Sequence, residues 1–518
     1  MLKFLLPPDY DLAHLAAWLT CQIEPTAIPV HTNHVILYDT FDWRLFRQSL
    51  ALIGSDSRYT LYDLAADRAV ATAVMPEAPV FVWDLPHGLL RARMDPIIRA
   101  RALLAQADVL LRTAVYVALN QDGNPQAGLE VEEIRPSAHA AFAPVSAVLA
   151  IQPLPEQGAA AQAMAERLVL AGVTAVATTY HVALAAAGQT PGSYATRPDI
   201  ALTPDMRADE ATKTILRYLF QVMRANEAYI QQDIDTEFLH DFRVAVRRTR
   251  SALGQIKAVF PPESTDRFKE AFKVIGKLSN QLRDLDVYLL AEEEYKVQLA
   301  PFLRDQIDPL FVYLRQKRIQ ALQDVSDGLQ SAAYRQVMAD WEAFLAEPEA
   351  DEAETAVSPP GAPKAATPII KLARRRIYKR YLQVMDAGQI ILAQNQHGLM
   401  HSLRIECKKL RYLMEFFADL FPPDELGLLI RRLKLLQTHL GDLNDLNVQQ
   451  AYLLHIADEL PLTRKHDRRA LVAIGWLVAN LEQKKTQAKA ESAAAFSQFA
   501  AAENAQLFAK LFNPPQNS

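Results

Sequence analysis

The chain has 518 residues, of which 50% are hydrophobic and 22% charged, and its formal net charge is −5 at pH 7. This length allows two or three domains. Because the net charge is negative, the chain as a whole does not attract polyanions, and any polyanion site must be local. Cys21 and Cys407 lie too far apart in the sequence to suggest a disulfide scaffold. No apolar run is long enough to span a membrane. We therefore expect a cytoplasmic protein.

Residues 1–187 predict an α+β domain. Asp122-Gly123 suits a hairpin turn between two strands. Asp95-Pro96 can open a helix, and Gly172 can end another. Alternating or continuous apolar runs predict strands at Val35–Tyr38, Val80–Trp83, Thr113–Leu119 and Val145–Ile151, and the helices are predicted at Ile97–Ala107 and Ala159–Ala171.

The rest of the chain predicts an all-α domain in two halves. Residues 188–204 are rich in Gly, Pro, Ser and Thr and predict a linker. Apolar residues at three- and four-residue spacing then predict amphipathic helices over 205–345 and 369–512. The stretch 346–368 is rich in Glu, Ala and Pro, which predicts a solvated acidic hinge between the halves.

The two halves contain a repeat at an offset of 161 residues. Eleven of 48 positions are identical between 240–287 and 401–448. One inserted residue upstream shifts the offset, so that Lys213 and Arg217 fall opposite Arg375 and Lys379. The most distinctive repeated positions are His240, Arg243, Arg247, Arg248 and Arg250, which recur as His401, Arg404, Lys408, Lys409 and Arg411.

Each repeated segment predicts a helix with one cationic face. At helical spacing, Phe242 and Val246 fall opposite the histidine and most of the cations. Like charges on one face repel each other, and residues 369–415 contain ten Lys and Arg against three Asp and Glu. We therefore expect a ligand with many phosphates, which guanidinium and ammonium groups bind well and which could bridge both copies.

These residues resemble the CHAD family, the conserved histidine α-helical domain, over about 205–512. The resemblance rests on both histidine-led basic helices, on Leu282-Arg283-Asp284-Leu285-Asp286-Val287 and on the segment from Leu436-Gln437 to Val448. It implies two pseudo-symmetric four-helix bundles whose basic helices line a central cleft. It also implies binding of inorganic polyphosphate without catalysis, association with polyphosphate granules and possible contact with granule proteins. The ten repeated positions would bind the ligand, with Lys213, Arg217, Arg375 and Lys379 as weaker candidates.

The N-terminal domain resembles the CYTH group of triphosphate-tunnel proteins in one segment, Tyr38-Asp39-Thr40-Phe41-Asp42-Trp43-Arg44-Leu45. Enzymes of that group need a Glu-x-Glu-x-Lys strand near the N-terminus, where this chain has Met1-Leu2-Lys3-Phe4-Leu5-Leu6. The paired arginines expected downstream are replaced by Ala51-Leu52-Ile53-Gly54. We therefore predict a degenerate domain with no catalytic residues, metal or cofactor. Glu130 and Glu132 could be remnants of a metal site or a solvated hairpin edge.

Two other functions stay open from the sequence. The same basic helices could bind nucleic acid, but the first copy has no aromatic residue aligned with Tyr412 for base stacking, which disfavours nucleic acid as a partner. The N-terminal domain could be a metal-dependent triphosphatase or polyphosphate-processing enzyme, which the missing glutamates disfavour. We expect Asp284 and Asp445 to cap a helix or to hold a neighbouring arginine.

Overall fold

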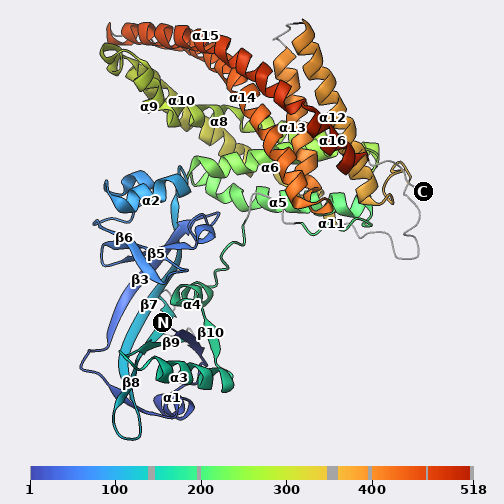
Figure 1. The fold of residues 1–518 in the computed structure, drawn as a ribbon. Coiled ribbons are helices and arrows are strands. Elements are labelled where there is room, and N and C mark those ends of the chain that lie inside the picture. The colour runs from blue at the N-terminus through green and yellow to red at the C-terminus, as the bar shows by residue number, and fades with distance from the viewer. Residues whose placement is uncertain are drawn as a thin grey trace. The chain divides into compact units, whose positions relative to one another are not determined.

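A computed structural model describes residues 2–137, 146–194, 200–346, 360–394, 399–461 and 465–513. The chain forms two compact units, Met1–Thr196 and Arg197–Ser518 (Figure 1). The boundary between them falls inside the segment 188–204. Within the described residues, no helix is both long and apolar enough to cross a membrane.

The first unit is built on one antiparallel sheet. Its strand order is β10-β1-β9-β8-β7-β3-β4-β5-β6, and β2 pairs with β7. The strands are β1 (Leu2–Leu6), β2 (Gln22–Pro25), β3 (His31–Thr40), β4 (Leu50–Ser55), β5 (Arg58–Asp63), β6 (Arg68–Val74), β7 (Leu103–Leu119), β8 (Pro125–Pro136), β9 (Ser146–Pro153) and β10 (Thr174–Val176). The helices are α1 (Leu12–Leu19), α2 (Leu89–Ile98), α3 (Gly158–Leu170) and α4 (Thr179–Ala186), with 3-10 turns η1 (Phe46–Gln48) and η2 (Val82–Asp84).

Helices cover both faces of this sheet. Successive side chains of a strand point to opposite faces, so each strand contributes side chains to the core on both sides. On β8, Leu129 and Val131 pack toward α1 and α3, which lie side by side (Figure 1). Ile134 packs with α4 on the other face, where Val35 and Val109 also lie. The strand β9 is buried on both faces over 147–151, which explains why its sequence is continuously apolar.

Most predicted elements of this unit are confirmed. The strands predicted at 35–38 and 113–119 lie within β3 and β7, and the strand predicted at 145–151 matches β9, although residue 145 lies outside the described residues. The helix predicted at 159–171 is α3, after which Gly172 adopts a φ of +82°. Gly123 has a φ of +78° in the turn between β7 and β8, as a hairpin glycine requires.

Two predictions for this unit are wrong. The helix predicted at Ile97–Ala107 is instead the end of α2 followed by β7, and Pro96 lies in the last turn of α2 rather than in its first. Leu90 and Met94 are buried at four-residue spacing and anchor α2 earlier in the sequence. The strand predicted at Val80–Trp83 is a 3-10 turn, because the Asp84 carboxylate accepts hydrogen bonds from the backbone amides that a strand would have paired.

The second unit is all helical, as predicted. The long helices α14 and α15 run side by side (Figure 1). Its helices are α5 (Ala208–Gln231), α6 (Thr236–Gln255), α7 (Pro262–Leu278), α8 (Asn280–Leu290), α9 (Glu292–Gln298), α10 (Asp308–Gln330), α11 (Ala332–Ala346), α12 (Ile369–Gln394), α13 (Met400–Phe416), α14 (Pro423–Glu459), α15 (Lys465–Phe499) and α16 (Ala502–Phe512), with 3-10 turns η4 (Pro301–Leu303), η5 (Asp305–Ile307) and η7 (Ala418–Leu420).

The helix ends keep the offset of the sequence repeat. The helix α6 ends at Gln255 and α13 at Phe416, while α7 begins at Pro262 and α14 at Pro423. Both prolines occupy the first turn, where a missing N–H costs no hydrogen bond. The implied pseudo-twofold arrangement of two four-helix bundles stays a prediction.

The last part of the predicted hinge, residues 360–368, is packed and not fully solvated. Residues 347–359 lie outside the described residues, but 360–368 pack against the helices: Ala362 and Ala365 are fully buried. The Asp209 amide donates to the Ala365 carbonyl over 3.1 Å, and the Ala208 amide donates to the Thr367 carbonyl over 2.9 Å. Small residues allow this close approach, so the stretch before α12 is a fixed connection to the start of α5.

Candidate polyanion site

The two repeated basic helices, α6 and α13, lie against each other. Arg248 of α6 forms an ion pair with Glu415 of α13 at 2.6 Å. The Gln255 side chain donates a hydrogen bond to the backbone carbonyl of Lys409 over 3.1 Å. The two copies of the repeat, which the sequence predicted to share a ligand, are therefore in contact through these helices. The contact brings together cations that are more than 150 residues apart in the sequence.

Five of the ten predicted positions form a connected group, which we call the cationic strip. Arg247 acts electrostatically on Arg243 along α6 and on Lys408 across the contact between the helices. Lys408 is in turn affected by Arg404 and Arg411 on its own helix. The strip thus consists of Arg243, Arg247, Arg404, Lys408 and Arg411, and draws on both copies of the repeat.

Burial and like charges in the strip disfavour the charged forms of two of its side chains. Burial, followed by the charges of Arg404 and Arg247, lowers the pKa of the Lys408 ammonium from 10.5 to about 8. Burial and Arg247 also lower the pKa of Arg243 from 12.5 to about 10, while Asp284 acts in the opposite direction. An anion bound here would stabilise the charged form of both side chains.

Several predicted cations, Arg411 of the strip among them, have carboxylate partners, which corrects the expectation that few acids are placed to neutralise them. Glu415 contacts Arg411 at 3.3 Å and Lys434 at 3.9 Å in addition to Arg248. Glu406 pairs with Lys409 at 2.7 Å and with Arg380. The spacing of these acids from Arg411 and Lys409, four and three residues along one helix, was a signal for the local pairs. The pair that joins α6 to α13 carries no such signal.

Two aspartates flank the strip. Asp445 forms an ion pair with Arg404 at 3.3 Å, which confirms the expectation that it holds a neighbouring arginine. Asp284 interacts electrostatically with Arg243 and Arg283, and burial raises its pKa above the ordinary value despite these two cations. Arg283 was not among the predicted site residues, although it precedes Asp284 directly.

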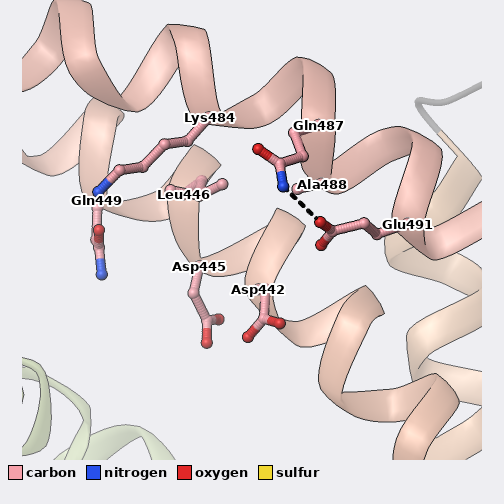
Figure 2. Close-up of a pocket in the computed structure, with 8 residues that line it drawn as sticks. All are labelled: Asp442, Asp445, Leu446, Gln449, Lys484, Gln487, Ala488 and Glu491. Carbon is pink, nitrogen blue, oxygen red and sulfur yellow. Dashed lines mark hydrogen bonds between the residues drawn. The ribbon is translucent and has the colours of Figure 1, made fainter.

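An acidic pocket of about 410 Å³ lies beside the strip, between α14 and α15. Figure 2 shows Asp442 and Asp445 extending from α14 on one side of this pocket, while Lys484 and Glu491 extend from α15. Glu491 accepts a hydrogen bond from Gln487 over 2.7 Å. Asp445 borders both the pocket and Arg404. The carboxylates of α14 therefore mark one edge of the cationic strip.

The remaining repeated positions differ between the copies. His401 is exposed, and its Nδ1 shares a hydrogen bond of 2.6 Å with the Asn444 side chain. His240 is half-buried on α6. The Arg250 guanidinium lies beside Gly276 of α7, and one of its nitrogens is 3.8 Å from the position that a Cβ atom would take on this glycine.

The four weaker candidates separate into two pairs. Lys213 is buried over the Phe344 ring, and Arg217 donates a hydrogen bond to the Leu345 carbonyl over 2.9 Å, so both help to pack α5 against α11. Arg375 and Lys379 are exposed on α12. They gather with Arg376 around Lys364, whose pKa is lowered by burial and by these three cations. Lys364 and Arg376 were not among the predicted site residues.

In the first unit, the interpretation of Glu130 and Glu132 as a solvated hairpin edge is wrong. Both lie on β8, which is paired on one side with β7 and on the other with β9. Glu132 accepts a hydrogen bond from Thr179 over 2.5 Å, and burial raises its pKa. Glu130 accepts one from Gln152 over 3.1 Å. Among the described residues, no group of three His, Cys, Asp or Glu side chains is placed to hold a metal ion.

The segment that resembles CYTH proteins has a structural role here. Asp39 is fully buried and its carboxylate accepts hydrogen bonds from the backbone amides of Thr40, Leu45 and Phe46. Burial raises its pKa to about 6, although these amides oppose the shift. Asp42 pairs with Arg44 at 2.9 Å. These contacts fix the turn that follows β3.

The two basic helices of the repeat, which lie against each other, define a helical protein with a candidate polyanion site. Residues 214–454 match the family model of the CHAD domain, so the second unit contains a CHAD domain. The antiparallel sheet of the first unit is consistent with a CYTH-like fold.

The solved structures similar to the chain include those of two proteins with low sequence identity. The crystal structure of the CHAD domain from the plant Ricinus communis is 22% identical, with a TM-score of 0.47, and the match covers 58% of this chain and 96% of that one. PptA from Streptomyces chartreusis is 15% identical, with a TM-score of 0.44, and the match covers 57% of this chain and 100% of that one. No curated protein matches the chain.

Proposed function

We propose that the helical unit binds inorganic polyphosphate on the cationic strip, without catalysis, and that it carries the protein to polyphosphate granules in the cytoplasm. The observation that carries this proposal is the meeting of Arg247 and Lys408 across α6 and α13. Among the described residues, neither side chain has a hydrogen bond or ion pair. Both are therefore available for an external anion.

The charge distribution favours a ligand with a high density of phosphates. The strip contains five cations from two helices, of which Arg404 is paired with Asp445 and Arg411 with Glu415. A single phosphate could neutralise only part of this group, whereas a phosphate chain can contact successive cations on both helices and gain avidity from them. The groove that the CHAD resemblance implies would guide such a chain.

The aromatic residues beside the strip favour polyphosphate over nucleic acid. Single-stranded nucleic acids gain much of their affinity from bases stacked on exposed aromatic rings. Tyr412 is only 6% exposed, and the guanidinium groups of Arg248 and Arg411 lie 5.7 and 5.3 Å from its ring centroid. Its ring is already engaged by cations and is a poor platform for a base.

The first unit supports the non-catalytic part of the proposal. A triphosphate tunnel needs charged side chains on the inner face of the sheet, but here the α4 face carries Val35, Leu37 and Val109. Lys3 of β1 is held by Asp67 at 3.1 Å. Lys3, Asp67 and Glu132 are the charged side chains among these aliphatic ones in the cavity on this face, and aliphatic walls cannot replace the solvation of a triphosphate and its metal ions.

The test is a titration of the full chain with polyphosphate of defined length over a series of salt concentrations. Replacing both Arg247 and Lys408 by Ala should flatten the plot of log affinity against log salt by about 1.4, from about 0.7 per lost phosphate contact in a single-stranded polyanion. Lys273→Ala is the matched control, because Lys273 is exposed and pairs locally with Glu270. Its slope should not change.

Three results would count against the proposal. The double variant could bind polyphosphate with an unchanged salt slope while remaining folded. Single-stranded RNA or DNA could displace polyphosphate at equal phosphate concentration, which would favour nucleic acid as the ligand. Release of phosphate from tripolyphosphate with Mg²⁺ or Mn²⁺, abolished by Glu132→Gln, would show that the first unit is an enzyme.

A further inference from the structure

The first unit contains a cavity of about 190 Å³ between the sheet and α4. Its walls are mainly aliphatic: Val35 and Leu37 come from β3, Val109 and Leu111 from β7, and Ala183 from α4. Most of these side chains belong to the core on this face of the sheet. Such a surface binds the apolar part of a ligand and disfavours a phosphate chain.

One part of the lining is polar and has an excess of negative charge. Lys3 and Asp67 neutralise each other in their ion pair, and the Lys3 side chain is only 12% exposed. Glu132 also lines the cavity, and its hydrogen bond comes from the neutral Thr179 hydroxyl. Glu130, two residues away on the same strand face, adds negative potential. Glu132 therefore has no ion pair among the described residues, although the charge of Lys3 acts on it.

A second polar group in the lining has unused hydrogen-bonding capacity. Tyr180 of α4 is 4% exposed, and its hydroxyl has no hydrogen-bond partner among the described residues. A buried hydroxyl without a partner costs free energy, which a bound molecule with a polar hydrogen could recover. The cavity thus combines apolar walls with an unpaired carboxylate and a buried hydroxyl.

We propose that this cavity binds a small apolar primary amine, whose ammonium group pairs with Glu132 and whose hydrocarbon part lies between β3, β7 and α4. The volume suits this class, since a cavity of about 150 Å³ lined by aliphatic side chains can hold benzene. A carboxylate of the same size would add a like charge beside Glu132, and a neutral hydrocarbon would leave the Glu132 charge unpaired. The site is independent of the cationic strip and of polyphosphate binding.

The experiment uses the full chain and three probes of similar size: 2-phenylethylamine, 3-phenylpropanoate and ethylbenzene. We expect 2-phenylethylamine to bind with one site per chain by calorimetry or ligand-observed NMR, and the other two probes to bind at least about tenfold more weakly, the factor that about 1.4 kcal/mol of charge pairing provides. Glu132→Gln should lower the affinity for the amine by about tenfold or more on the same basis.

Two further variants separate the site from general effects on the fold. Glu130→Gln is the matched control, because Glu130 lies on the same face of β8 but does not line the cavity, and its affinity should stay within about twofold. Leu111→Phe fills the cavity from a half-buried wall position and should abolish binding without loss of circular dichroism signal. The proposal is overturned if the amine does not bind, if Glu132→Gln binds it as well as the parent, or if the anionic or neutral probe binds equally well.

Discussion

Replacement of Lys408 should stabilise the free protein while weakening polyphosphate binding, because burial first and the neighbouring cations second disfavour its charged form. The fall of its pKa from 10.5 to about 8 corresponds to about 3 kcal/mol at about 1.4 kcal/mol per pH unit. Lys408 is partly exposed, and solvent screening reduces the expected gain for Lys408→Met to about 1–2 kcal/mol near pH 7.

The pH dependence distinguishes charge strain from improved packing. Because the folded-state pKa lies below the unfolded one, the cost of Lys408 is complete below about pH 8 and disappears as the pH rises toward 10.5. The stabilisation by Lys408→Met should therefore fall by about half or more between about pH 7 and pH 9.5. A methionine that only packs better would give the same gain at both values.

Urea unfolding of the full chain, followed by circular dichroism, measures this difference. Lys273→Met is the control, since Lys273 is exposed beside Glu270 and its replacement should change stability by less than about 0.5 kcal/mol. A loss of stability in Lys408→Met near pH 7, or a gain independent of pH, would refute the assignment of strain to this residue. So would polyphosphate affinity equal to that of the parent.

Three other perturbations test neighbouring parts of the site. Polyphosphate binding should take up protons near pH 8.5, because bound phosphate raises the lowered pKa of Lys408; calorimetry in buffers of different ionisation enthalpy should show an uptake that Lys408→Met removes. Asp445→Asn releases Arg404 from its ion pair and should steepen the salt dependence of polyphosphate binding by up to about 0.7, measured as a slope in the same titration. Glu415→Gln removes the carboxylate that pairs with the Arg248 side chain, which is 9% exposed, and should lower the free energy of unfolding by about 3 kcal/mol in urea titrations. An unchanged value would show that this pair does not stabilise the contact of α6 with α13.

The sequence was most informative where the helical period was long and repeated. The ends of α6 and α13 and the starts of α7 and α14 keep the repeat offset, since Pro262 and Pro423 open their helices in the same way. Short apolar runs were less informative. Val80–Trp83 suits a strand by composition, but the Asp84 side chain takes its amides and makes a turn. Such a competition depends on one side chain, which periodicity does not detect.

The candidate site was predictable only in part. Helical spacing placed the repeated cations on one face of each helix, but it could not show that Arg248 reaches Glu415 in the other copy. Lys213 and Arg217 had the same repeat signal as Arg375 and Lys379, yet they are used in packing α5 against α11. The cavity of the first unit depends on α4 meeting β3 and β7, which are distant from it in the sequence.

The structure gives adjacent cations of each copy different roles. Arg248 and Lys409 occupy matching positions, and each is neutralised by a glutamate of α13, Glu415 in one case and Glu406 in the other. Arg247 and Lys408, one residue earlier, have no such partner among the described residues and face each other's charge. Consecutive residues of a helix point about 100° apart, so one can hold the two helices together while the next stays exposed to ligand. The attachment of α6 to α13 through the Arg248–Glu415 pair therefore keeps the unneutralised pair close enough to share one polyanion.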